Sequence, residues 1–189
     1  MVKKGSIRSH RVETRLTLDE LSKRDKLMAE LLPFFSSRKE QVYLVGGYLR
    51  DLLLGKISSD VDFVVVGNVP SFAKTLADGR GYSFFVLDKI QGTSRVVVKE
   101  KETVRTVDFA ALRGKTITDD LLLRDFTINA MAFDIQAFIE KRKVSFPEDL
   151  IDPVGGWTDL NKGIIQVVSN AAFMDDPVRL LRAFRFSSS

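Results

Sequence analysis

The chain has 189 residues, of which 44% are hydrophobic, so it is long enough to bury one sizeable core in one or two domains. It contains no cysteine, which excludes disulfide bonds and thiolate metal sites, and no apolar run approaches the roughly 20 residues of a membrane-spanning helix. Its 29 basic and 25 acidic residues form a mixed surface with a formal charge of +4, which mildly favours an anionic partner; with no secretion-signal hydrophobic region, a cytoplasmic protein is expected.

The first 40 residues are predicted to form a basic arm and one helix. Residues 1–15 are polar and basic, a composition typical of a solvated tail or of a segment that contacts RNA. The capping-box pattern from Thr17 to Glu20 predicts the start of a helix, and Pro33 is its expected end. Its apolar residues lie near one face, which is expected to pack against a sheet: Leu21, Met28, Leu31 and Leu32.

From residue 41 onward, strand-like and helix-like segments follow one another, which predicts a mixed α/β unit. Strands are expected at residues 41–45, 61–66, 83–88, 94–99 and 103–109. Helices are expected at residues 47–54 and, from Pro70, at residues 70–77. The glycine-containing segment 152–156 is expected to be a turn.

Two aspartates at the head of the strand 61–66 indicate a metal and nucleotide site. Because side chains alternate along a strand, Asp60 and Asp62 point to the same face. Mg²⁺ prefers oxygen ligands and commonly binds one or two carboxylates together with substrate phosphates. Gly46 and Gly47 allow a ligand to approach the backbone, the helix after them directs N–H groups at a phosphate, and Arg50 adds a charged contact. Without these neighbours, the two aspartates would also fit a solvated strand end.

Three segments, in this order along the chain, resemble the motifs of the class II tRNA nucleotidyltransferase and bacterial poly(A) polymerase family. They are residues 46–62, residues 123–132 and residues 175–186, and the whole resemblance covers residues 41–186. It implies a nucleotidyltransferase-like mixed β-sheet flanked by helices at residues 41–153, followed by the start of an α-helical neck at residues 154–189. Residues 1–40 would then be an N-terminal arm and helix.

Asp108 is the candidate third carboxylate. It ends the strand 103–109, which is expected to lie next to the strand of Asp60 and Asp62. The resembling family places a carboxylate in the corresponding segment, where it acts as general base for the primer 3′-hydroxyl or orients it. The alternative is a structural aspartate paired with Arg105 or Arg113.

The second segment carries a nucleotide-binding set by the same resemblance. Arg124 can contact phosphate and Asp125 a sugar hydroxyl, and Asn129 belongs to the polar start of a predicted helix at residues 127–132. The family usually has two arginines before the aspartate, whereas Leu123 occupies the first of these positions here.

The third segment is helical in pattern, with acidic residues and Pro177 in its first turn. Asp176 and Arg179 together offer hydrogen-bond acceptors and a planar donor group, which suits the Watson–Crick edge of cytosine or adenine. By resemblance they are the base-selecting pair, and Arg182 and Arg185 support the nucleotide. The alternative is a solvated basic face.

The resemblance implies an Mg²⁺-dependent enzyme that adds C, A or both from CTP and ATP to the 3′ end of tRNA and releases pyrophosphate. Residues 114–123 are shorter than the loop of CCA-adding members, so CC addition is an alternative, as is poly(A) addition. Family members continue into helical regions that hold tRNA, so a truncated or fragmentary chain is expected. Two further alternatives are a nucleotide-binding domain without catalysis and an interaction domain whose charged residues form only salt bridges.

Overall fold

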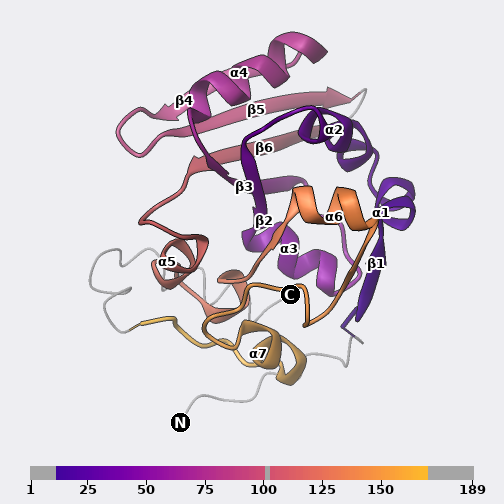
Figure 1. Ribbon diagram of the computed structural model, residues 1–189, viewed down its shortest axis with the longest axis vertical. Coiled ribbons are helices and arrows are strands. Elements are labelled where there is room, and N and C mark those ends of the chain that lie inside the picture. Colours follow the sequence, from indigo (N-terminus) through magenta and orange to yellow (C-terminus); the bar gives the residue numbers. More distant parts are fainter. Residues whose placement is uncertain (1–11, 101–102, 170–189) are drawn as a thin grey trace.

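A six-stranded sheet forms the centre of the computed structural model, which describes residues 12–100 and 103–169 (Figure 1). The strand order is β4-β5-β6-β3-β2-β7. The strands are β2 (Gln41–Val45), β3 (Asp60–Val66), β4 (Ser83–Asp88), β5 (Thr93–Glu100), β6 (Thr103–Ala111) and β7 (Ala132–Asp134). β3 and β6 run parallel, whereas the other neighbouring pairs of this sheet are antiparallel. The predicted mixed α/β fold is therefore confirmed.

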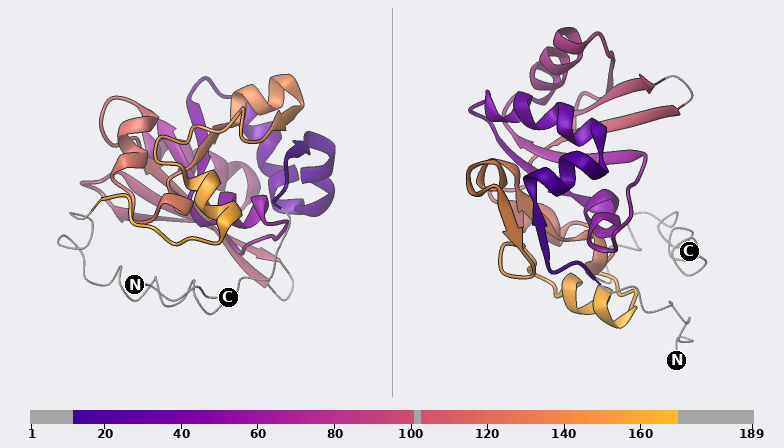
Figure 2. Two further views of the ribbon diagram at one scale, coloured as in Figure 1. Left: turned by 90° about the horizontal axis from the view of Figure 1, so that it is seen from below. Right: turned by 90° about the vertical axis from the view of Figure 1, so that its right-hand side faces the viewer.

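Helices cover one face of this sheet and enclose the main core with it (Figure 2). They are α2 (Lys26–Ser36), α3 (Gly46–Leu53) and α4 (Val69–Arg80). Strand alternation directs every second apolar side chain of β2, β3, β5 and β6 into this layer. At its centre lie four buried phenylalanines with ring centroids 4.9 to 6.2 Å apart: Phe35, Phe63, Phe72 and Phe109.

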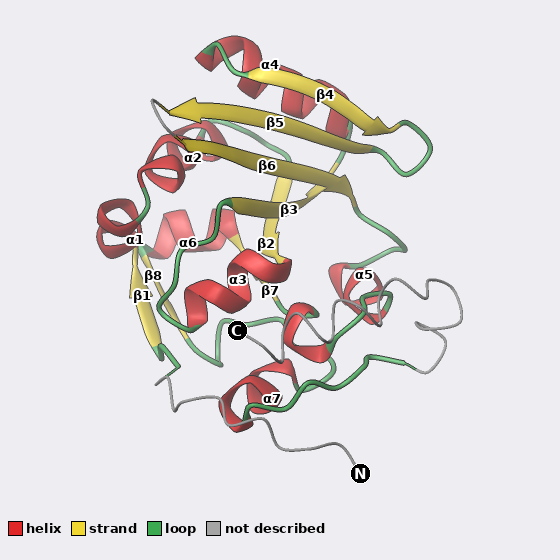
Figure 3. Cartoon of the chain, turned by 180° about the vertical axis from the view of Figure 1, so that it is seen from behind, coloured by secondary structure: helices red, strands yellow, loops and turns green. Residues whose placement is uncertain are grey.

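The opposite face is covered only in part by the described residues. A smaller apolar cluster lies over β2, β3 and β7 and includes Tyr43, Val64 and Leu121. Figure 3 shows the sheet from this side, where α4 lies behind β4 and β5. The side chains of β4, β5 and β6 that point to this face are partly exposed, among them Phe85 and Val104. Within residues 12–100 and 103–169, the sheet thus has a packed face and a partly exposed face, which is called the open face below.

The N-terminal helix differs from its prediction. The capping box at Thr17 and Glu20 is present, but the chain forms two helices, α1 (Leu18–Arg24) and α2, which meet at Asp25. Pro33 lies inside α2 rather than at its end, and the predicted end is wrong. A proline in a helix interior costs about 3 kcal/mol, but the last turn of α2 buries Phe35 completely in the core, which offsets much of that cost.

Buried Asp25 forms hydrogen bonds with three elements: α2, α3 and β6. Its side chain accepts hydrogen bonds from the backbone N–H groups of Leu27 and Met28 and so caps α2. It also accepts a bond of 2.6 Å from the hydroxyl of Tyr48 in α3 and two bonds of 2.5 and 2.8 Å from Arg105 in β6. Burial alone would raise the pKa of Asp25, but the bonds from Arg105 and Tyr48 outweigh it and hold this pKa below its usual value.

The segment after β6 adds β7 to the edge of the sheet beside β2. Its elements are α5 (Ile117–Leu122), the 3₁₀ helix η1 (Thr127–Asn129), α6 (Ile135–Lys141), β8 (Lys143–Ser145) and α7 (Gly156–Lys162), and β8 pairs with β1 (Arg15–Thr17). The helix predicted at residues 127–132 is wrong, because η1 ends at Asn129 and Ala132 pairs with Val45 of β2. The turn at residues 152–156 caps α7 through Asp152, which accepts from the N–H groups of Gly156 and Trp157. Each helix of the described chain is too short or too polar to span a membrane.

The contact between α7 and η1 gives a stability test. A Cβ atom at Gly156 would lie 2.1 Å from the backbone oxygen of Thr127. Gly156→Ala is therefore expected to lower the free energy of unfolding by about 1 to 3 kcal/mol, because α7 has to move away from η1. Gly79→Ala in α4 is the matched control: its Cβ would meet no atom within 4 Å, and it is expected to raise the free energy of unfolding by about 0.5 to 1 kcal/mol. Denaturant titration measures both values, and equal stabilities would contradict the close contact.

Candidate active site

The three predicted carboxylates lie on the open face of the sheet. β3 and β6 pair in parallel with Asp62 opposite Asp108 and Asp60 opposite Thr106. Residues directly opposite each other share a face, so Asp62 and Asp108 are neighbours, as the alternation along each strand predicts. Asp60 accepts a hydrogen bond of 2.6 Å from the Thr106 hydroxyl, two residues before Asp108 on β6. The fold therefore brings Asp60, Asp62 and Asp108 to one end of one strand pair.

Arg95 on β5 is the cation that binds Asp108. Its Nε donates to one carboxylate oxygen and its Nη2 to the other, each at 2.7 Å. This two-bond geometry fixes the orientation of the Asp108 carboxylate. The pairing with Arg105 or Arg113 that was considered from the sequence is not formed, because Arg105 binds Asp25 and Arg113 binds Asp120. Arg95 was missed because the cross-strand register that places it opposite Asp108 is not visible in the sequence.

Asp62 is a carboxylate whose pKa is strongly raised. Burial raises the pKa of Asp62 to about 6, and the negative charges of Asp108 and Asp60 act in the same direction. The positive charge of Arg124 and a hydrogen bond from the backbone N–H of Gly47 oppose this shift. Such an acidic group, short of compensating positive charge, is suited to bind a cation.

Gly46 is required where α3 approaches Asp62. Its φ angle is +72°, and a Cβ atom there would lie 2.8 Å from Oδ2 of Asp62. The N-terminus of α3 has no side-chain cap, and the N–H of Gly47 at this end donates to Asp62. The glycine pair was predicted to let a phosphate approach the backbone. In the structure, the space that a side chain at Gly46 would occupy is taken by the Asp62 carboxylate.

Arg50 and Asn129 connect the first predicted motif to the second. Arg50 donates through Nη1 to the side-chain oxygen of Asn129 at 2.7 Å, and through Nε and Nη2 to Asp51. Asp51 in turn accepts from the hydroxyl of Ser58, in the loop that leads into β3. Asn129 also donates to Asp125 at 3.4 Å. The bond between Arg50 and Asn129 joins residues 79 positions apart, so the two motifs form one polar network beside α3.

Arg124 and Arg113 share a buried partner that sequence reasoning missed. Asp120 in α5 is only 1% exposed and accepts hydrogen bonds from both guanidinium groups. Burial alone would raise the pKa of Asp120, but the bonds and charges of Arg113 and Arg124 hold it below its usual value. Asp120 and Arg124 are four residues apart near the end of a capped helix, and this spacing was the signal that could have indicated the pair. The pair holds Arg124 near Asp62.

The donor set fits a divalent cation. Asp60 and Asp62 supply carboxylate oxygens on one face of the sheet, beside Asp108 on the neighbouring strand. Within residues 12–100 and 103–169, no group of three or more carboxylate or imidazole side chains is close enough to hold a metal ion alone. A divalent cation held here would therefore have Asp60 and Asp62 as its protein ligands and would need water or substrate oxygens to complete its shell.

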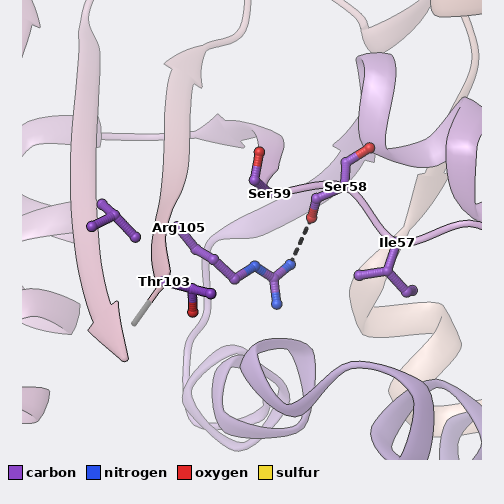
Figure 4. Close-up of a pocket in the computed structure, with 6 residues that line it drawn as sticks. Ile57, Ser58, Ser59, Thr103 and Arg105 are labelled. Carbon is purple, nitrogen blue, oxygen red and sulfur yellow. Dashed lines mark hydrogen bonds between the residues drawn. The ribbon is translucent and has the colours of Figure 1, made fainter. Parts of the chain in front are cut away.

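A shallow pocket lies at the starts of β3 and β6 (Figure 4). Its volume is about 390 Å³, and Ile57, Ser58, Val104 and Arg105 are among its lining residues. Arg105 donates to the backbone oxygen of Ser58 at 2.9 Å and also binds Asp25. The guanidinium group is thus engaged in holding the loop before β3, which positions Asp60 and Asp62. The predicted base-selecting residues Asp176, Arg179, Arg182 and Arg185 lie outside the described residues.

Comparison with known proteins identifies the family. The profile of the poly(A) polymerase head domain matches residues 42–166, which include the carboxylate cluster, α3 and the polar network around Asn129. The chain belongs to the poly(A) polymerase head domain family. The resemblance inferred from the three motifs is therefore confirmed.

Similar relatives of this head domain carry several different names. A CC-adding tRNA nucleotidyltransferase of Geobacter sulfurreducens is 42% identical over 146 residues, which are 77% of this chain and 31% of that protein. An A-adding tRNA nucleotidyltransferase of Aquifex aeolicus is 37% identical over 164 residues, 78% of this chain and 18% of that protein. This head domain thus spans less than half the length of these curated relatives.

Solved structures of CCA-adding enzymes share the fold of this head domain. The Thermotoga maritima CCA-adding enzyme complexed with tRNA CCA has a TM-score of 0.71 and 37% identity, and the match covers 92% of this chain and 41% of that one. A CCA-adding enzyme in complex with ATP has a TM-score of 0.72 and 35% identity, and the match covers 93% of this chain and 41% of that one.

The approach of α3 to Asp62 can be tested with two neighbouring glycines. Gly46→Ala places a Cβ against the Asp62 carboxylate at a positive φ angle, so it is expected to lower the free energy of unfolding by about 1 to 3 kcal/mol. Gly47→Ala is the control, because its Cβ would lie at an ordinary 3.7 Å from Arg50. It is expected to change this free energy by less than about 1 kcal/mol. Urea denaturation compares the two variants, and a similar loss in both would contradict this geometry.

The charge of Asp62 predicts a pH-dependent stability. Its folded-state pKa of about 6 lies above the ordinary 3.8, so ionised Asp62 destabilises the metal-free fold above pH 6, and this penalty fades as the pH falls from about 6 to about 4. Asp62→Asn is expected to stabilise the chain at pH 7.5 in EDTA by about 1 to 3 kcal/mol and to lose most of this advantage near pH 4. Thermal melting across this pH range measures the effect. Asp78→Asn on the surface of α4 is the control, and the same pH profile in both variants would refute the prediction.

Proposed function

We propose that this chain is the catalytic head of an Mg²⁺-dependent tRNA nucleotidyltransferase that adds C, A or both to the tRNA 3′ end. In this reaction the RNA 3′-hydroxyl attacks the α-phosphate of CTP or ATP, and pyrophosphate leaves. The observation that carries the proposal is the register of β3 and β6, which puts Asp62 opposite Asp108 beside the uncapped start of α3. Relatives that are named tRNA nucleotidyltransferases support it.

Asp60 and Asp62 would hold the cation. A bound Mg²⁺ supplies Lewis-acid activation of the attacking hydroxyl and neutralises charge on the phosphates. Asp108 receives the proton of the 3′-hydroxyl or orients this group, and Arg95 holds its carboxylate in one orientation for that task. Each of these roles uses a side chain on the open face of the sheet.

The other predicted residues bind the nucleotide. Arg124 lies close enough to lower the pKa of Asp62 and contacts the triphosphate. The guanidinium group of Arg50 lies close to Gly47 at the start of α3, and with the N–H groups of Gly46 and Gly47 it would contact the phosphates. Asp125 and Asn129 hold the ribose hydroxyls. The third motif completes the pocket: Asp176 and Arg179 select the base, and Arg182 and Arg185 support the nucleotide.

A CC-adding enzyme is the second candidate. The connection from Arg113 to Arg124, which is short in sequence, is occupied by α5 with a capping box at Thr116 and Asp119. Little of this connection therefore remains to form a long flexible loop. The CC-adding relative from Geobacter sulfurreducens is 42% identical to this chain, which favours the same product.

The proposed domain division places the head at residues 41–153 and the start of the neck at residues 154–189, after the arm and helix of residues 1–40. Buried side chains of α2 belong to the main core together with those of the sheet. The proposed tRNA substrate favours a cytoplasmic protein.

The function is tested by nucleotide binding and primer extension. Calorimetric titration with CTP, ATP, GTP and UTP in Mg²⁺ is expected to show binding of CTP, ATP or both and not of the other two. Three tRNA transcripts are then extended: one that ends before the CCA sequence, one that ends after its first C and one that ends after its second C. The residues added to each identify the product. An Asp60→Asn/Asp62→Asn double variant is expected to lose about 100-fold or more in extension rate.

The matched control for the double variant is Asp78→Asn, whose carboxylate pairs with Lys74 on the surface of α4. This control is expected to keep wild-type binding and extension. Equal affinity for all four nucleotides, or binding that the double variant retains in full together with its Mg²⁺ dependence, would refute the proposal. Termination after two added C residues would support the CC-adding candidate.

A further inference from the structure

Phe85 is an exposed aromatic residue on the open face of the sheet. It lies in the edge strand β4 and is 53% exposed, whereas its neighbour Phe84 packs against the main core. An exposed phenylalanine on a strand edge leaves apolar area in water and increases the risk of aggregation. The position of Phe85 relative to the carboxylates suggests what it binds.

Cross-strand pairing aligns Phe85 with the candidate active site. Phe85 is opposite Arg95, Arg95 is opposite Asp108, and Asp108 is opposite Asp62. Directly opposed residues share a face of the sheet, so these four side chains form one row across β4, β5, β6 and β3. Neighbouring strands are about 4.8 Å apart, which places Phe85 about 14 Å from Asp62 along this row.

Arg95 lies between the aromatic ring and the carboxylates. Its side chain is 39% exposed, and within the described residues it donates two hydrogen bonds, both to Asp108. A guanidinium group has five N–H donors, so others remain for a phosphate. A ring beside an arginine, in line with a polymerising site, is the combination that binds single-stranded nucleic acid through base stacking and phosphate contact.

The described residues leave Phe85 and Arg95 of this row accessible. α4 packs on the opposite face, and the smaller apolar cluster covers the β2, β3 and β7 end of the sheet (Figure 3). We propose that Phe85 and Arg95 form a subsite for the single-stranded 3′ segment of the RNA. A base upstream of the reacting terminus stacks on Phe85, and an upstream phosphate binds Arg95. This inference rests on the proposed function, because the RNA terminus has to lie at Asp62 and Asp108.

RNA binding without catalysis tests the subsite. The probe is a fluorescein-labelled single-stranded RNA that ends in two C residues, titrated into the chain in EDTA without nucleotide. Phe85→Leu keeps an apolar side chain but removes the ring, so it is expected to weaken binding about ten-fold, whereas Phe85→Trp is expected to bind within about two-fold of wild type. Arg95→Gln is expected to reduce the slope of log affinity against log salt by about 1.

The matched control is Ile90→Ala. Ile90 is 99% exposed and belongs to the same hairpin, but it lies outside the row of opposed residues. This control is expected to bind RNA as the wild type does. Thermal melting of all variants checks that the fold is intact, and a second RNA with 5-iodouridine in the upstream position is expected to crosslink to Phe85.

Equal RNA affinity of Phe85→Leu and Ile90→Ala, or a crosslink elsewhere on the chain, would overturn the subsite. So would the loss of a self-associated species in Phe85→Leu with RNA affinity unchanged, because the ring would then serve contact between copies. These outcomes are independent of nucleotide incorporation. Failure of primer extension with normal Phe85-dependent RNA binding would count against the proposed function alone.

Discussion

The pairing of two carboxylates across a parallel strand pair is the constraint on which the site depends. Asp62 and Asp108 are direct partners between β3 and β6, where two negative charges repel each other, more strongly as water is excluded. Positive groups surround them: Arg95 binds Asp108, Arg124 acts on Asp62, and the N–H of Gly47 donates to Asp62. The carboxylate pair is therefore held together by contacts from three different elements: β5, the segment after α5, and the start of α3.

Most of the sheet could be predicted from the sequence because strand patterns are local. The expected strands at residues 41–45 and 61–66 agree with β2 and β3 within one residue at each end, and alternation alone put Asp60 and Asp62 on one face. Two local predictions were wrong because tertiary contacts outweighed propensity. Pro33 did not end its helix since Phe35 is buried beyond it, and the predicted helix at residues 127–132 stops at Asn129 because Ala132 joins the sheet edge.

The polar partners of the site could not be predicted, because they come from distant parts of the chain. Arg95 reaches Asp108 through strand register, and Arg105 reaches Asp25 across 80 residues. A charged residue in a sequence does not reveal whether it faces a ligand or another side chain. Family resemblance supplied roles for Asp108 and Arg124, but it did not indicate that buried Asp120 holds Arg124 in place.

Asp25 makes the first motif dependent on a residue outside the matched region. One carboxylate caps α2, accepts the hydroxyl of Tyr48 from the helix after the glycine pair, and neutralises Arg105 on the strand of Asp108. Loss of any partner leaves a buried polar group unsatisfied, so substitutions at Asp25, Tyr48 and Arg105 should be strongly non-additive. Across evolution, these three positions are expected to show epistasis: a change at one becomes tolerable only after the others have changed, which links the history of the N-terminal segment to that of the sheet.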